Sequence, residues 1–176
     1  KWYTFNDEGA NSSTVNMILD HNTTAGVAYN STKVNTEPKE VATALINDTQ
    51  SWNNSLNARL ITADEVAKIT GNTSFNGETS TSGSWFYLDS NNQTKTATTQ
   101  GASKYSWLYD YTNDCTNYGC NIVDSSTYGY WTSTSVAGSG SPVWYVHGNG
   151  HLNSNFANNT LYGVRPVITV SKSIVS

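Results

Sequence analysis

The sequence predicts a single α+β domain covering residues 1–176, with strands first, then two helices, then a mostly antiparallel run of strands. Three observations support this prediction. The chain has 176 residues, which is enough for one domain with a sizeable core and short for two. Apolar residues follow helical spacing in 36–54 and 58–72. Elsewhere, short apolar and aromatic runs alternate with turn-forming Asn, Gly and Ser.

Neutral polar residues replace charged ones throughout the chain. Charged residues make up only 12%, about half the usual share, while six Trp and eleven Tyr supply bulky core material. The net charge is −4 and Lys and Arg form no cluster, so nucleic acid is not an expected partner. No apolar run reaches the roughly 18 residues of a membrane span. We therefore expect membrane or pilus anchoring only through a segment preceding Lys1.

The N-terminal half should contain two strand regions and two helices. The apolar runs VNMIL (15–19) and AGVAY (25–29) predict short strands. In 36–54, Pro38 suits the first helical turn, and Val41, Ala44, Leu45 and Asp48 follow helical spacing.

The second helix has a start and a stop signal of its own. In 58–72, Thr62 and Glu65 form a capping box, and Gly71 occupies the position after the last turn. Val66 and Ile69 should face the core.

Long polar loops should follow, from 72 to about 103, interrupted by one aromatic strand, SWFYLDS. Trp107 and Leu108 should then be buried ahead of the only two cysteines, Cys115 and Cys120. Their spacing closes a small loop containing Asn and Gly, which favours a disulfide and an oxidising compartment. The alternative is two free buried thiols, while a zinc site would lack two ligands.

Three strand-like segments close the chain: TYGYWTSTSV, SPVWYVHGNGHL and YGVRPVITVSKSIV. The last is rich in β-branched residues, and we expect it to return beside the first strand. Arg165 lies within this apolar segment and could contact a ligand. We favour a partly buried arginine that binds loop carbonyls, because its five donors can organise long loops.

The layout resembles the C-type-lectin-like fold, with two helices, a mostly antiparallel twisted sheet and long loops. More narrowly, it is similar to formylglycine-generating-enzyme-like domains and to the variable proteins of diversity-generating retroelements, on Trp144 and the run Gly163, Val164 and Arg165. The stretches ARLIT, GYWTST and YGVRPVI also resemble C-terminal domains of secreted, pilin-like proteins of Gram-positive gut bacteria. The resemblance implies structural roles for Trp144, Gly163 and Arg165.

The resemblance transfers neither calcium binding nor catalysis. No Asp or Glu occurs from Ser125 to Val164, which disfavours a conventional calcium site. Formylglycine-generating enzymes need reactive cysteines, but the charges nearest to Cys115 and Cys120 are acidic and would raise a thiol pKa. We therefore expect no enzyme, no cofactor and no metal.

The segment HGNGHLNSNFANNT (147–160) is the candidate binding region. A three-residue hairpin loop would place His147 opposite His151, as a two-histidine metal contact requires, whereas a two-residue loop would separate them. Even then two ligands are too few, so solvent-facing histidines at a turn are the favoured interpretation.

Alternation would place 147, 149, 151, 153 and 155 on one face. Retroelements of this kind mutate adenines, commonly in Asn codons, and the residues found here are ones that such codons can become. We predict that the ligand-binding residues are His147, Asn149, His151, Asn153, Asn155, Phe156, Asn158 and Asn159, with help from Tyr130.

These inferences predict a secreted or surface-anchored bacterial binding domain, adhesin-like and without catalysis. Its surface at 147–161 would be hypervariable, and its partner an unknown protein or glycan on another cell, a phage or a host surface. One alternative is a structural, pilin-like filament subunit. A second alternative is an enzyme of the formylglycine-generating type.

Overall fold

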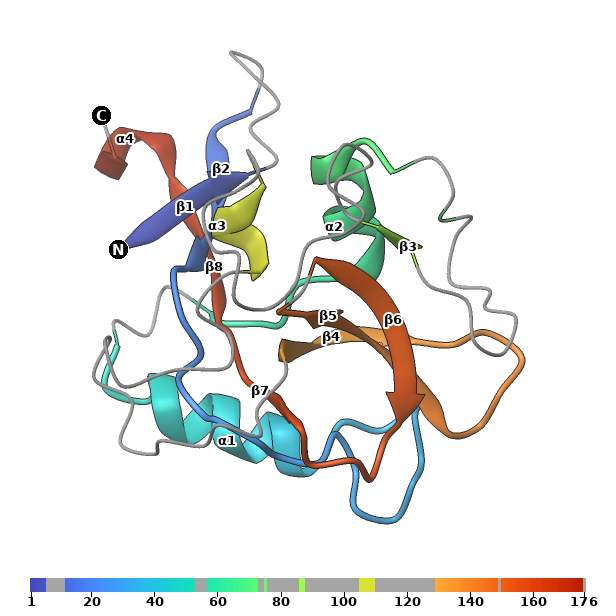
Figure 1. Ribbon diagram of the computed structural model, residues 1–176. Coiled ribbons are helices and arrows are strands. Elements are labelled where there is room, and N and C mark those ends of the chain that lie inside the picture. Colours follow the sequence, from blue (N-terminus) through green and yellow to red (C-terminus); the bar gives the residue numbers. More distant parts are fainter. Residues whose placement is uncertain are drawn as a thin grey trace.

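The computed structural model describes residues 1–5, 12–52, 57–72, 75, 86–87, 105–109, 129–148 and 150–175. These residues form an α+β fold, so the predicted fold class is confirmed at this level (Figure 1). The predicted disulfide between Cys115 and Cys120 lies outside the described residues. The elements are β1 (Trp2–Phe5), β2 (Thr14–Leu19), α1 (Glu40–Thr49), α2 (Ala63–Thr70), β3 (Phe86–Tyr87), α3 (Ser106–Tyr109), β4 (Gly129–Ser135), β5 (Pro142–His147), β6 (His151–Phe156), β7 (Tyr162–Gly163), β8 (Val167–Ser171) and α4 (Lys172–Val175).

A three-stranded antiparallel sheet joins the two ends of the described chain, in the order β1-β2-β8. The final strand was expected beside the first predicted strand, 15–19, and β8 does pair with β2 there, while β1 lies on the other side of β2. Val15 and Ile18 of β2 point to opposite faces of the sheet, and both are buried. A strand that is apolar on both faces is best placed at the centre of a sheet, which fits the position of β2.

A second sheet of five strands has the order β3-β6-β5-β4-β7. All of its pairs are antiparallel except β4 with β7, which is parallel. The register of β4 against β5 shifts between Trp131 and Ser135, which marks a bulge or irregularity. Figure 1 shows this sheet at the centre of the molecule, between α1 and α2.

Both faces of the five-stranded sheet contribute to a core. Trp144, Val146 and Leu152 belong to a cluster that also contains residues of α2 and α3. Trp131 and Tyr145 belong to a second cluster, on the opposite face. Alternation along each strand sends successive side chains to these two clusters, so burial is not confined to one side of the sheet.

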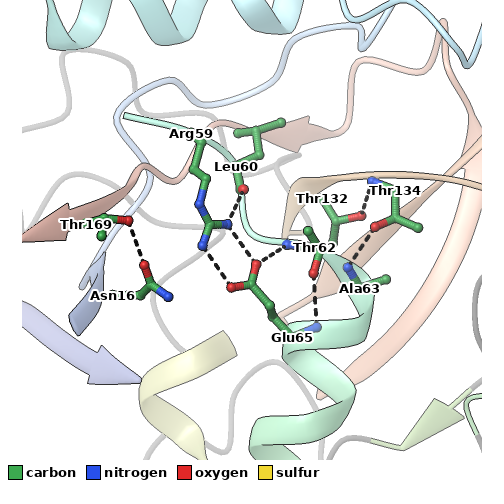
Figure 2. Close-up of polar contacts among 9 residues, drawn as sticks. All are labelled: Asn16, Arg59, Leu60, Thr62, Ala63, Glu65, Thr132, Thr134 and Thr169. Carbon is green, nitrogen blue, oxygen red and sulfur yellow. Dashed lines mark hydrogen bonds and ion pairs between the residues drawn. The ribbon is translucent and has the colours of Figure 1, made fainter. Parts of the chain in front are cut away.

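The predicted start and stop of α2 are confirmed. The Thr62 hydroxyl accepts a hydrogen bond from the Glu65 N–H at 3.0 Å, the Glu65 carboxylate accepts one from the Thr62 N–H, and Gly71 adopts a left-handed φ of 67°. Glu65 also accepts two bonds from Arg59, at 2.7 and 2.8 Å (Figure 2). Because the main chain of Arg59 pairs with Val167 of β8, this network ties α2 to the three-stranded sheet.

Two local expectations were wrong. Pro38 precedes α1, which begins only at Glu40, because the Lys39 N–H is donated to the Tyr29 carbonyl. The run 25–29 forms no strand; Val27 donates to the Tyr162 carbonyl, but no ladder follows. Among the described residues, no helix has the length and apolar character needed to cross a membrane.

Candidate functional site

The β5–β6 hairpin carries the predicted binding segment. Its loop covers residues 148–150, and His147 pairs directly with His151. The Gly150 N–H is donated to the His147 carbonyl at 2.9 Å, and Gly150 has a φ of 90°, a conformation that favours glycine. Of the two loop lengths left open by the sequence, the structure therefore adopts the longer one.

The two histidines are half-buried and neutral near pH 7. Burial lowers the pKa of His147, and burial together with the charge of His147 lowers the pKa of His151 to about 4. Within the described part of the chain, no three His, Cys, Asp or Glu side chains gather as a metal site would require. Paired neutral imidazoles are thus the chemistry that this end of the hairpin offers.

The alternating face of β6 turns inward. Register places Asn153 opposite Tyr145, and the Tyr145 ring stacks on Tyr162 with centroids 3.8 Å apart. Asn153 is only 8% exposed, and the Asn155 amide donates to the Tyr162 hydroxyl at 3.0 Å. The expected exposed ligand face formed by His147, His151, Asn153 and Asn155 is therefore corrected to a half-buried one, because aromatic rings of neighbouring strands cover it. Asn149 lies outside the described residues.

Tyr130 is a core residue, which corrects its predicted role in ligand contact. Its side chain is fully buried, and its hydroxyl donates to the Leu108 carbonyl at 2.6 Å. Its ring centroid lies 5.1 Å from the guanidinium carbon of Arg165. A ligand at the surface cannot reach a side chain in this position.

Arg165 is fully buried and binds main-chain carbonyls, as the favoured interpretation of the sequence requires. Its guanidinium donates to the carbonyls of Leu19, Leu108 and Trp107, each at 2.6 Å. These contacts join β2 and the short helix α3 to the segment before β8. Trp144, also fully buried, contacts the Phe75 ring edge to face with centroids 5.1 Å apart.

The end of β6 presents side chains to solvent. Phe156 is 52% exposed, and as the residue after Asn155 in β6 it lies on the opposite face of the strand. Ala157, the next residue, is fully buried and anchors the turn in the core. The Asn159 N–H is donated to the Phe156 carbonyl at 2.9 Å, which closes the turn. Asn158 and Thr160 are exposed, and Asn159 is half-buried.

A loop far away in sequence completes this surface. The Lys33 ammonium lies 4.0 Å from the centroid of the Phe156 ring. The Asn30 N–H is donated to the Ala157 carbonyl at 2.9 Å, and this bond fastens the two turns together. Figure 1 shows the loop before α1 beside the turn after β6. No local sequence signal pointed to Lys33, because it meets Phe156 only in the folded chain.

We call the group formed by Lys33, Phe156, Asn158, Asn159 and Thr160 the Phe156 surface. It combines one aromatic ring, one cation, amides and a hydroxyl. None of these five residues is an acid or a thiol.

Comparison with known proteins places the chain in a family. A family model described as a domain of unknown function, DUF6273, matches residues 18–172. The match begins within β2, ends at the start of α4 and includes all of the Phe156 surface. No curated protein and no solved structure matches the chain. The chain belongs to the DUF6273 family.

Proposed function

We propose that this protein is an extracellular, adhesin-like ligand-binding domain without catalytic activity, and that the Phe156 surface is its contact site. The observation that carries the proposal is the half-exposed Phe156 ring, held on a hydrogen-bonded turn beside Lys33. Aromatic side chains fixed on rigid turns and surrounded by neutral amides are efficient anchors, because little conformational entropy is lost on binding.

We further propose that the domain has a C-type-lectin-like fold. Three features support this. Strands from the two ends of the chain share one sheet, α1 and α2 follow the N-terminal strands, and a second sheet is built from the later strands. In this arrangement the turn after β6 lies between rigid elements, where a binding surface keeps its shape.

Diversification by a retroelement remains part of the proposal, restricted to positions where the fold tolerates change. Phe156, Asn158 and Thr160 are exposed, whereas Asn153 is buried and pairs with Tyr145 of the neighbouring strand. Coding DNA from several strains tests this idea. Substitutions over adenine positions should concentrate at 156 and 158–160, and an even scatter along the chain would overturn it.

Cell binding tests the proposed function. Fluorescently labelled domain is applied to a panel of bacterial and epithelial cells, and bound fluorescence is measured by flow cytometry. Phe156→Ala should weaken the binding to responsive cells about tenfold or more, because an aromatic anchor is lost. Ile46→Ala is the matched control, since Ile46 is 65% exposed on α1 and lies outside the Phe156 surface. Equal binding by wild type and Phe156→Ala, or equal losses in both variants, would contradict the proposal.

A further inference from the structure

We propose that the ligand of the Phe156 surface is a sugar bearing a carboxylate, which pairs with Lys33 while the sugar ring packs on Phe156. This inference rests on the proposed function and adds the chemical class of the ligand. It follows from the charge, the rigidity and the small size of the surface.

The Phe156 surface is positively charged, because Lys33 is the one ionised side chain among its five residues. Within the described residues, Lys33 forms no ion pair. Glu40 contacts the same loop and keeps its negative charge, but hydrogen bonds from the N–H and hydroxyl of Ser31 hold its carboxylate at Ser31. The turn that carries Phe156 belongs to a segment, 125–164, without any Asp or Glu. Lys33 is therefore available to pair with an anion, although the net charge of the protein is −4.

The backbone that carries Lys33 is fixed in an uncommon conformation. Lys33 has a φ of 69°, which costs energy for a side chain other than glycine. Asn30 maintains it: its side-chain oxygen accepts bonds from the N–H and hydroxyl of Thr32, and its carbonyl accepts the Lys33 N–H at 2.9 Å. These bonds fix the backbone of Lys33, and not its side chain, before any ligand arrives.

The present partner of the ammonium is one that an anion can replace. Lys33 is held at Phe156 by the face of an aromatic ring, a weak contact at an exposed site. A carboxylate offers the ammonium a charge-assisted hydrogen bond instead. When the flexible lysine side chain moves to the carboxylate, it uncovers the ring for stacking.

The size and composition of the surface favour a sugar over a protein. Stable protein interfaces bury several apolar side chains at their centre. Here the exposed large apolar residues of the described chain that lie on these two turns are Phe156 and Val34, and Val34 is only 38% exposed. The amides of Asn158 and Asn159 and the hydroxyl of Thr160 instead match the hydroxyl groups of a sugar.

Titration calorimetry with paired probes tests the inference. The probes are 3′-sialyllactose and lactose, which share a disaccharide and differ by a carboxylate-bearing sugar, and a glucuronic-acid oligosaccharide as a second acidic probe. Wild type should bind both acidic probes at least about tenfold more tightly than lactose. Lys33→Gln should reduce the affinity for both acidic probes to the affinity for lactose. Phe156→Ala should reduce the affinity for all three probes. Lys68→Gln, at an exposed position on α2, is the matched control and should change nothing.

Each failure has a distinct meaning. Equal affinity for acidic and neutral sugars, or acidic-sugar binding unchanged in Lys33→Gln, overturns the inference. A glutamate-rich peptide that binds through Lys33 where no sugar does also overturns it, in favour of a protein ligand. If Phe156→Ala still abolishes cell binding in those cases, the proposed function stands without this ligand class. Amide NMR spectra of each variant establish that the fold is unchanged.

Discussion

Gly163 and Arg165 lie two residues apart and hold the same region together in different ways. A Cβ atom at Gly163 would lie 2.2 Å from the Ala25 carbonyl oxygen and 2.3 Å from that of Thr24. Arg165 reaches further, to three carbonyls on two other segments. The glycine permits a close approach of two backbones, and the arginine donates hydrogen bonds to main-chain acceptors on both segments.

Substitution of Gly163 should reveal the cost of losing this close approach. Gly163→Ala forces two main-chain carbonyls to move, so we expect the free energy of unfolding to fall by about 3 kcal/mol in urea denaturation. Gly140→Ala is the matched control, because a Cβ there meets nothing within 4 Å. It should change stability by no more than about 0.5 kcal/mol. Similar values for the two variants would show that the backbone contact at Gly163 is unimportant.

The structural role of Arg165 could be predicted from its own sequence context, whereas that of Tyr130 could not. An arginine within an apolar strand must find acceptors, and carbonyls of loops are the common ones. A tyrosine beside a polar segment is compatible with either surface or core. Its burial depends on Leu108 and Arg165, which reach it only through the tertiary fold.

At the scale of elements, the capping signals of α2 predicted its ends correctly, whereas the sequence did not predict which strand faces are covered. The capping box and final glycine of α2 are encoded within ten residues, from Thr62 to Gly71. The alternation of β6 correctly indicated which side chains share a face. It could not indicate which face is covered, because the cover comes from Tyr145 and from Tyr162, beyond the next turn.

The β5–β6 hairpin should weaken in acid because its paired histidines are buried as neutral groups. In the unfolded chain, histidine takes up protons near its ordinary pKa of about 6.5, whereas the folded pKa of His151 is about 4. The unfolded state therefore binds more protons as pH falls through this window. The contribution of neutral His151 to the free energy of unfolding is complete above about pH 6.5, falls as the pH drops toward 4, and then levels off.

Urea denaturation of wild type and of His151→Asn, each at pH 7.5 and at pH 4.5, measures this effect. Because His151 is only half-buried, water screens much of the effect. Between pH 7.5 and pH 4.5 we expect the free energy of unfolding to fall by about 1 kcal/mol more in wild type than in the variant. Identical pH dependence in both proteins would mean that the imidazole pair is not buried as described.

At the scale of the whole molecule, two sheets with cores on both faces leave little of the hairpin exposed. The sequence predicted binding residues along the whole of 147–159, and among the described residues of that segment the exposed side chains lie at the end of β6 and in the turn after it. It also adds Lys33, from a loop more than one hundred residues earlier. Such a pairing depends on tertiary structure, so no local pattern in a single sequence could reveal it.

The most direct test of this account is a saturation library of residues 30–34, 130 and 147–161, displayed on yeast. It is sorted once for display, which reports folding, and once for binding to the cells that wild type recognises. Substitutions at Phe156, Asn158 and Lys33 should lose binding and keep display, whereas those at Asn153 and Tyr130 should lose display. Loss of binding with intact display at His147, Asn153 and Asn155, together with tolerance at Phe156, would contradict it.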